Sequence, residues 1–390
     1  MFSVLRSTRK VLQGLVLSAV ALAVAACDPM ATGGGPLVNT SKPIPVALLV
    51  PSGSGNSGDE ILAQSLENAA RLAMADLDGV TIDLRVYPTA GSPQTAAERA
   101  TQAINEGARI ILGPVYAEAA NAAGTAAANR GVNVLSFSNN QAIAGGNVFV
   151  LGPTFQNTAN RMVSFASATG KSNIVIVHSR DDAGEQGRSA IQNAIAANGA
   201  TLSGTVGYAP SQQDVVASIS TIRSTIQQSG ANAVFLTSPT STALPLLTQL
   251  MPEAGIDPLQ TQYIGLTRWD IPAQTLSLPG VQGGWFAVPD PAASAGFSAR
   301  YQAAYGQAPH PIGGLAFDGI AAIGALVSQG SADALTTQSL TQAAGFRGAS
   351  GIFRLMPNGT NERGLAIATI TANQVQIISP APQFFGAAGF

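Results

Sequence analysis

The chain has very few of the residues that build disulfides, metal centres and catalytic triads. Among its 390 residues there are one cysteine and two histidines. One cysteine excludes an internal disulfide, and this inventory leaves no Cys/His cluster with the spacing of a metal site. No serine stands in a G-x-S-x-G nucleophile motif. We therefore expect a protein that is not an enzyme and that uses no cofactor.

Charge is also scarce. Charged residues make up 10% of the chain and the formal net charge is −2, whereas an average protein is roughly 25% charged. A weakly acidic chain has no electrostatic reason to bind nucleic acid or to lie on an anionic membrane surface. These partners are therefore not expected, and solubility depends on uncharged polar residues.

The single cysteine, Cys27, follows a short apolar segment near the N-terminus. A basic region comes first, then an apolar run over residues 11–23, then small residues up to the thiol. This pattern is typical of a lipoprotein signal peptide over residues 1–26, whose cleavage leaves Cys27 as an acylated first residue. The alternative is an ordinary secretory signal with Cys27 incidental. A transmembrane anchor needs roughly 20 apolar residues, and this run is shorter. We expect an exported protein, lipid-anchored to the inner or the outer membrane of the cell envelope.

Beyond a Gly- and Pro-rich tether over residues 27–43, apolar strands alternate with amphipathic helices. Residues 46–50 are continuously apolar, as in a strand buried on both faces, and residues 59–77 place apolar side chains on one helical face. Ser92 followed by proline indicates another helix start. The alternation begins again after Gly152, so we expect an α/β fold with two doubly wound parallel-sheet lobes.

The C-terminal part departs from this alternation. Predicted strands at 350–356 and 364–371 flank Asn358-Gly359, a pair that favours a tight hairpin turn. The chain turns again at Asn373 into a last strand, and residues 380–390 form a tail. A closing meander after two α/β units indicates that the chain crosses between the lobes more than once.

The most conspicuous motif is a G-x-G-x-x-G over residues 53–58, between the first strand and the first helix. A dinucleotide site would also need an acidic residue at the end of the second strand. That strand ends at residues 86–89 without one, and export removes the supply of nucleotide. We interpret the motif as a small-residue loop at the carboxyl edge of a sheet, where ligands of doubly wound folds bind.

Several short segments, in this order, resemble the type I periplasmic-binding-protein fold, in its leucine-binding-protein-like branch. They are residues 46–51, 107–114, 134–138, 174–178 with Gly184-Glu185, 279–284, 317–318 and 351–359. The resemblance implies two lobes joined by three crossovers, near residues 150–155, 286–292 and 345–350, and a cleft that closes on a small ligand. The N-terminal lobe would comprise residues 44–152 and 290–347, and the C-terminal lobe residues 153–289 and 348–379.

The amino-acid transporters of that branch hold a zwitterion with groups that this chain lacks. Glu118 stands in the loop that would bind the carboxylate, and Ala183 takes the place of an aromatic residue before Gly184-Glu185. The stretch that would supply an acid for the ammonium ends in Arg268 instead. A buried charge without a partner costs several kcal/mol, so we do not expect tight binding of an α-amino acid.

A second resemblance is to the penicillin-binding-protein activator lipoproteins. It rests on the anchor, on residues 46–51 and 86–91, and on Gly113-Pro114 with Val115. It implies a lipoprotein whose partner is a peptidoglycan synthase, that is, a penicillin-binding protein. The alternative is the substrate-binding component of an ABC importer of the branched-chain amino acid type, with an ABC permease as partner and an altered ligand.

The candidate cleft residues follow the carboxyl ends of the predicted strands. Most are neutral donors or acceptors: Ser52, Ser54, Asn56, Tyr116, Asn139, Asn140, Ser238, Thr240 and Thr267. The charged candidates are Glu118, Arg180, Asp181, Asp182, Arg268 and Asp318, any of which could instead latch the lobes together. Trp269 could pack on a ligand or in the core. The neutral set predicts an uncharged or polar ligand, and we interpret His178 as a hydrogen-bonded residue at a strand end.

Overall fold

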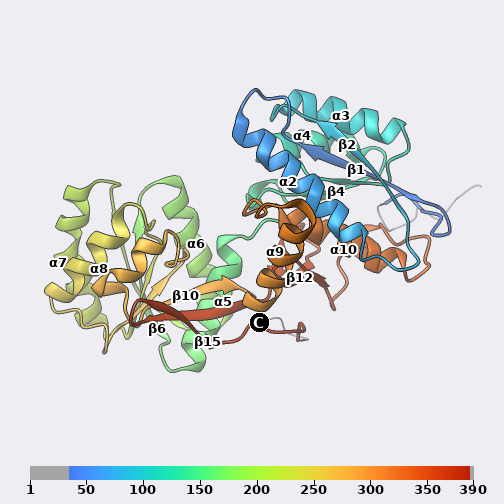
Figure 1. The fold of residues 1–390 in the computed structure, drawn as a ribbon. Coiled ribbons are helices and arrows are strands. Elements are labelled where there is room, and N and C mark those ends of the chain that lie inside the picture. The colour runs from blue at the N-terminus through green and yellow to red at the C-terminus, as the bar shows by residue number, and fades with distance from the viewer. Residues whose placement is uncertain (1–34, 387–390) are drawn as a thin grey trace, which may run out of the picture. The chain divides into compact units, whose positions relative to one another are not determined.

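The fold is taken from a computed structural model, which describes residues 35–386 (Figure 1). The predicted signal peptide, Cys27 and the last four residues lie outside the described residues, so acylation of Cys27 stays a prediction. None of the helices in residues 35–386 combines the length and the hydropathy that crossing a membrane requires.

The first lobe is a five-stranded parallel sheet in the order β2-β1-β3-β4-β5. Its strands are β1 Ile44–Val50, β2 Ile82–Pro88, β3 Ile110–Leu112, β4 Asn133–Ser136 and β5 Val148–Val150. Along β1, Val46 and Leu48 pack into one hydrophobic cluster, while Ala47 and Leu49 pack into another. Because successive side chains point to opposite faces of a sheet, both faces are covered, which explains the continuous apolar run.

Helices cover each face of this sheet. The helices α2 Ser57–Met74 and α10 Gly314–Val327 pack together over one face, and α3 Pro93–Asn105 and α4 Ala117–Ala128 pack together over the other (Figure 1). Ser92 accepts a hydrogen bond from the backbone of Thr95, and Pro93 occupies the first turn of α3. The helix start predicted at this pair is therefore confirmed.

The second lobe is a seven-stranded sheet in the order β15-β14-β10-β9-β8-β6-β7. Its strands are β6 Asn173–Ser179, β7 Thr201–Tyr208, β8 Ala233–Leu236, β9 Gln262–Gly265, β10 Trp285–Pro289, β14 Leu365–Thr371 and β15 Gln374–Ser379. One face carries α5 Phe155–Ala168 and α6 Asp182–Ala197, and the other carries α7 Gln212–Ser229 and α8 Ala243–Glu253 (Figure 1). The two-lobed α/β prediction is confirmed.

The edge of the second sheet is antiparallel, and its last two strands are joined by the turn predicted at Asn373. Strand β14 runs antiparallel to β10 and to β15. The turn between β14 and β15 places Ala372 and Asn373 at positive φ, 50° and 63°. Two adjacent residues at positive φ match the twist of a two-residue hairpin, so the last two strands pair directly.

A third, three-stranded antiparallel sheet comprises β11 Phe346–Gly348, β12 Gly351–Leu355 and β13 Asn361–Arg363. The hairpin predicted at Asn358-Gly359 joins β12 to β13. The segment 364–371 joins the second lobe instead. Phe346, Phe353 and Leu355 are buried in the hydrophobic cluster of the first lobe, against α10. The chain therefore passes back to the second lobe near Gly364, and not at 345–350 as expected.

The remaining elements of residues 35–386 are three 3₁₀ helices and two α-helices. They are η1 Gln141–Ile143, η2 Ala273–Ser277, η3 Pro279–Val281, α9 Pro291–Tyr305 and α11 Thr337–Leu340. Of these, α9 contacts α2 and α11 contacts α10.

Candidate functional site

Each lobe has a point in its sheet where the strand order reverses. In the first lobe β1 lies between β2 and β3, and in the second lobe β6 lies between β7 and β8. Ligands of open α/β sheets bind in the crevice outside the carboxyl ends of the strands at such a point. The loops after β1 and β3, and those after β6 and β8, carry most of the residues proposed from sequence.

In the first lobe a buried carboxylate lies at this edge of the sheet. Asp59, at the start of α2, is 7% exposed. It accepts hydrogen bonds from Ser54 Oγ at 2.7 Å and from the hydroxyl of Tyr116. The hydrogen bond to Asp59, together with burial, raises the pKa of Tyr116. Ser54 and Tyr116, two of the candidate residues, thus both bind an acid that sequence analysis did not select.

The same edge has no cation in its loops. Residues 51–58, 89–92, 113–116 and 137–142 contain no lysine, arginine or histidine. A helix N-terminus attracts anions, but that of α2 already holds the acidic side chains of Asp59 and Glu60, the latter accepting from Gly53 N at 2.6 Å. Ser52 is half-buried, Asn56 caps α2, and Glu118 is exposed. The loops of this edge therefore offer no cationic side chain to a carboxylate, and the N-terminus of α4, which has no side-chain cap, carries Glu118 in its first turn.

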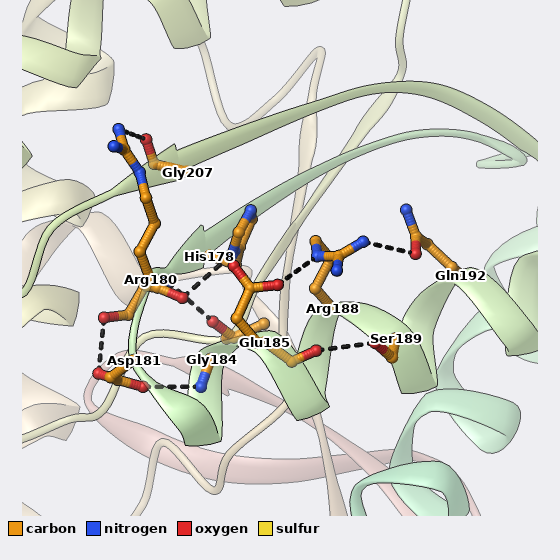
Figure 2. Close-up of polar contacts among 11 residues, drawn as sticks. His178, Arg180, Asp181, Gly184, Glu185, Arg188, Ser189, Gln192 and Gly207 are labelled. Carbon is orange, nitrogen blue, oxygen red and sulfur yellow. Dashed lines mark hydrogen bonds and ion pairs between the residues drawn. The ribbon is translucent and has the colours of Figure 1, made fainter.

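In the second lobe, Asp181 caps the N-terminus of α6. Its Oδ1 accepts from Gly184 N at 2.8 Å and its Oδ2 from Ser179 Oγ at 2.6 Å. These two hydrogen bonds hold the pKa of Asp181 below its usual range. The neighbouring Arg180 is exposed and extends toward β7, where it donates to the Gly207 carbonyl at 2.7 Å (Figure 2). The loop between β6 and α6 therefore contains an ionised carboxylate, that of Asp181.

Replacing Asp181 with alanine should lower the free energy of unfolding at pH 7 by about 1 kcal/mol, the usual value of an N-cap. Asparagine should retain most of it, because its side chain also caps. Since the folded-state pKa of Asp181 is depressed, its ionic contribution is complete above the unfolded pKa of roughly 3.9 and is lost as pH falls through the folded value. Urea unfolding at pH 7 and below pH 3 measures both effects. If Asp181→Ala lost as much free energy of unfolding below pH 3 as at pH 7, the ionised Asp181 would not be the stabilising cap.

Polar side chains in the first turns of α6 and at the end of β6 contact one another. His178 is buried and its Nδ1 lies 3.0 Å from the Ser179 carbonyl oxygen and 3.4 Å from Glu185 Oε1. Arg188 Nε donates to Glu185 Oε2 at 2.8 Å, and this bond lowers the pKa of Glu185 (Figure 2). His178 is hydrogen-bonded at a strand end, as predicted. No group of three or more metal-ligating side chains occurs in residues 35–386.

A hollow of about 470 Å³ lies between the loop after β4 and the helices α5 and α6. Its lining is dominated by carboxamides, which are Asn139, Asn140, Gln141, Gln156, Gln186 and Asn193. Glu185 is the one charged residue of the lining, and Arg188 pairs with it. Asn139 and Asn140 were among the predicted residues. The glutamines on α5 and α6, Gln156 and Gln186, were missed.

Two further hollows contain predicted residues. A pocket of about 480 Å³ in the second lobe, the switch-point pocket, is lined by the ends of β6 and β7 and by the loop after β8, and includes Asp181. A pocket of about 300 Å³ where the crossovers meet includes Arg268, His310 and Asp318. Burial lowers the pKa of His310, so it is neutral at pH 7. The predicted residues are therefore distributed over several hollows.

Two predicted residues are fully buried and do not line an open cleft. Ser238 is 0% exposed, and its buried hydroxyl is satisfied by a hydrogen bond with that of Tyr208, at 2.8 Å. Trp269 is 0% exposed and stacks on Phe286 in the core of the second lobe, with ring centroids 6.3 Å apart. Its indole ring belongs to the core, which was the other interpretation of this residue.

Other predicted side chains have partners within the protein. The hydroxyls of Thr240 and Thr267 donate to the carbonyls of Ile271 at 2.8 Å and Ser238 at 3.3 Å. Arg268 forms an ion pair with Asp270. The buried Asp318 pairs with Arg363 at 2.9 Å, a residue that sequence analysis missed. Its carboxylate thus holds the crossovers together, one of the two roles considered for it.

A family model described as periplasmic binding protein matches residues 43–374. The chain belongs to the periplasmic binding protein family. The search of curated proteins gave no match. Among solved structures, a putative branched-chain amino acid ABC transporter protein from Rhodospirillum rubrum is 16% identical with a TM-score of 0.72, over 86% of this chain and 100% of that one.

Two structures of similar fold contain different ligands. An ABC transporter substrate-binding protein from Desulfitobacterium hafniense in complex with Leu is 17% identical, with a TM-score of 0.60 over 86% of this chain and 100% of that one. A solute-binding protein from Rhodopseudomonas palustris in complex with 3,4-dihydroxybenzoic acid is also 17% identical, with a TM-score of 0.55 over 88% and 97%. One fold therefore serves ligands of unlike chemistry. These names describe transport proteins rather than activators of peptidoglycan synthesis.

Proposed function

We propose that this protein is the substrate-binding component of an ABC importer and that its ligand is an uncharged polar molecule rather than an α-amino acid. The family supports a binding role, and the transport proteins of similar fold support an importer. The observation that carries the ligand class is the neutral polar lining of the switch-point pocket, which includes the hydroxyls of Ser211 and Thr242 and the amide of Gln212. Amides offer both donors and acceptors, which suits hydroxyl and amide groups on a ligand.

The first lobe argues against a zwitterion. An α-carboxylate would need a cation or a free helix N-terminus at that edge. The edge loops carry no basic residue, Asp59 and Glu60 occupy the first turn of α2, and the uncapped N-terminus of α4 carries Glu118 in its first turn. Burying a carboxylate next to them costs several kcal/mol without compensation. An amino acid would therefore bind weakly if its carboxylate faced this lobe.

The proposal includes a membrane partner. An ABC permease would receive the ligand, and the acylated Cys27 would keep the protein at the periplasmic face of the membrane. The activator hypothesis predicts a different partner, a peptidoglycan synthase, and no dependence on a small ligand. A ligand screen therefore separates the two functions.

Neutral polar compounds should raise the melting temperature, whereas leucine and glutamate should leave it unchanged. At a hundred times its dissociation constant a ligand adds about 2.7 kcal/mol to the free energy of unfolding. A thermal-shift screen with amino acids, sugars, polyols, amides and cell-wall fragments measures this. Gln212→Ala, which alters the lining of the switch-point pocket, should reduce the shift, and Gln228→Ala, an exposed residue of the same helix α7 away from the pocket, should not. A strong shift with leucine would overturn the ligand class, and no shift with any compound would overturn the importer function.

A further inference from the structure

The switch-point pocket lies wholly within the second lobe. Its volume is about 480 Å³, and all its lining residues fall between Ser179 and Leu246. It opens where β6 ends, between the first residues of α7 and α8. This is the crevice at the reversal of strand order in the second sheet, the place at which an open α/β sheet binds its ligand.

The lining contains one charged group and many neutral ones. Asp181 is the charged residue, and the neutral polar groups include Ser179, Tyr208, Ser211, Gln212 and Thr242. No basic residue lines the pocket, and the neighbouring Arg180 donates to the Gly207 carbonyl (Figure 2). An anionic ligand would meet the Asp181 carboxylate without a cation to offset the repulsion.

Asp181 has acceptor capacity left for a ligand. Its two oxygens accept one well-formed hydrogen bond each, from Ser179 and Gly184, while the Ala183 backbone N–H makes a weaker contact. A carboxylate offers about four lone-pair sites, so about two remain. Hydrogen bonds to an ionised carboxylate are stronger than neutral ones, and the capping contacts hold the side chain in a fixed orientation. Two adjacent hydroxyl groups on a ligand match a pair of carboxylate oxygens.

The other walls of the pocket are apolar. Val215 from α7, Leu246 from α8 and Pro239 from the loop after β8 line it. A molecule with hydroxyls on one side and C–H groups on the other meets both kinds of surface. The hydroxyls of Ser211 and Thr242 and the amide of Gln212 complete the polar side.

We propose that the ligand is a neutral polyhydroxylated molecule, a sugar or a polyol, and that Asp181 binds two of its adjacent hydroxyl groups in the switch-point pocket. The inference rests on the proposed binding function and names the substrate class. An organic cation is disfavoured because such sites typically place aromatic faces around the charge, and Tyr208, the aromatic residue of this lining, is buried.

Titration calorimetry tests the substrate class. The protein is titrated with ribose, xylose, glucose, galactose and myo-inositol, and with putrescine and leucine as the cationic and zwitterionic alternatives. We expect at least one of the neutral compounds to bind. A deoxy analogue of that compound, lacking one hydroxyl of an adjacent pair, should bind at least tenfold more weakly.

Asp181→Asn tests the residue. Asparagine retains the N-cap but removes the charge, so the fold is kept while affinity falls about 10- to 100-fold, the range for a hydrogen bond to a charged group. Asp257→Asn is the matched control, because Asp257 also accepts a local backbone hydrogen bond, from Leu259 N at 2.9 Å, and does not line the pocket. It should leave the affinity unchanged.

The outcomes are distinguishable. Binding of a sugar or polyol that Asp181→Asn weakens and Asp257→Asn does not supports the inference. Binding of putrescine or leucine instead, or of a sugar whose affinity is equal in both variants, overturns it and leaves a binding function. Failure of every compound in this panel and in the wider thermal-shift screen overturns both.

Discussion

Replacing Arg363 with alanine should lower the free energy of unfolding by about 3–5 kcal/mol, the usual cost of removing one partner of a buried ion pair and leaving the other charge uncompensated. Arg363 and Asp318 have side chains 5% and 1% exposed, with Nη2 and Oδ2 2.9 Å apart. The guanidinium also donates to the Leu151 carbonyl and lies over the Phe353 ring, 5.3 Å from its centroid. Its removal leaves a buried carboxylate without a cation and a carbonyl without a donor.

Arg300→Ala is the matched control for Arg363. Arg300 pairs with Asp76, but the two side chains are 48% and 42% exposed, and such surface pairs contribute 0–1 kcal/mol. Urea unfolding of both variants gives the comparison. Adding Asp318→Asn to the Arg363 variant should recover part of the loss, because the neutral amide still accepts from Ala349 N. Equal effects of the two arginine variants would contradict a structural role for the Arg363–Asp318 pair.

The ion pair also determines where the crossovers are held. Arg363 is the last residue of β13 and donates to the Leu151 carbonyl in the first crossover, while Asp318 on α10 accepts from Ala349 N at 2.7 Å. Asn361 donates to the carbonyls of Val150 and Gly152. Segments more than 200 residues apart in the chain are thus joined by buried polar contacts, so their loss should affect the whole fold.

Trp269→Ala should lower the free energy of unfolding by about 3–5 kcal/mol, the range for removing a large aromatic side chain from a core. Two glycines leave the space for this indole ring. A Cβ at Gly265 would lie 2.3 Å from its Nε1, and a Cβ at Gly284 would lie 2.1 Å from its Cζ3. Trp269 is therefore enclosed by Gly265, Gly284 and Phe286, and replacing it with alanine would leave a cavity in the core.

The second tryptophan provides the comparison. Trp285 is only half-buried and packs edge-on against Phe165, 5.0 Å between centroids, so Trp285→Ala should cost less than Trp269→Ala. With two tryptophans in the chain, fluorescence of the single-tryptophan variants reports each one, and iodide should quench Trp285 more. Trp269→Phe should leave ligand affinity unchanged. A loss of affinity without a loss of stability would assign Trp269 to the ligand site instead.

The repeating strand–helix pattern predicted both lobes, because apolar periodicity depends only on neighbours along the chain. Caps such as Ser92 were predictable for the same reason. The third sheet was not, since the strands at 351–355 and 365–371 look alike in sequence while Phe353 packs on α10 and Ile367 packs in the second lobe. Which sheet a short apolar strand joins is decided by contacts with distant residues.

The candidate site was predicted in part. Position after a strand brought Ser54, Tyr116 and Asp181 to the carboxyl edges, because parallel strands end together. Burial could not be predicted: Ser238 and Trp269 also follow strands, yet both are covered by residues distant in sequence, Tyr208 and Phe286. Asp59 was missed because its role depends on Tyr116, which lies on another element.

The sequence by itself determined the α/β class, the two lobes and the scarcity of charge, because these follow from composition and local periodicity. Only the tertiary structure decided that Asp318 pairs with Arg363, that Trp269 is core, and that the polar residues divide among separate hollows. Those outcomes depend on which distant side chains reach one another, and on the free energy of burying each polar group with a partner.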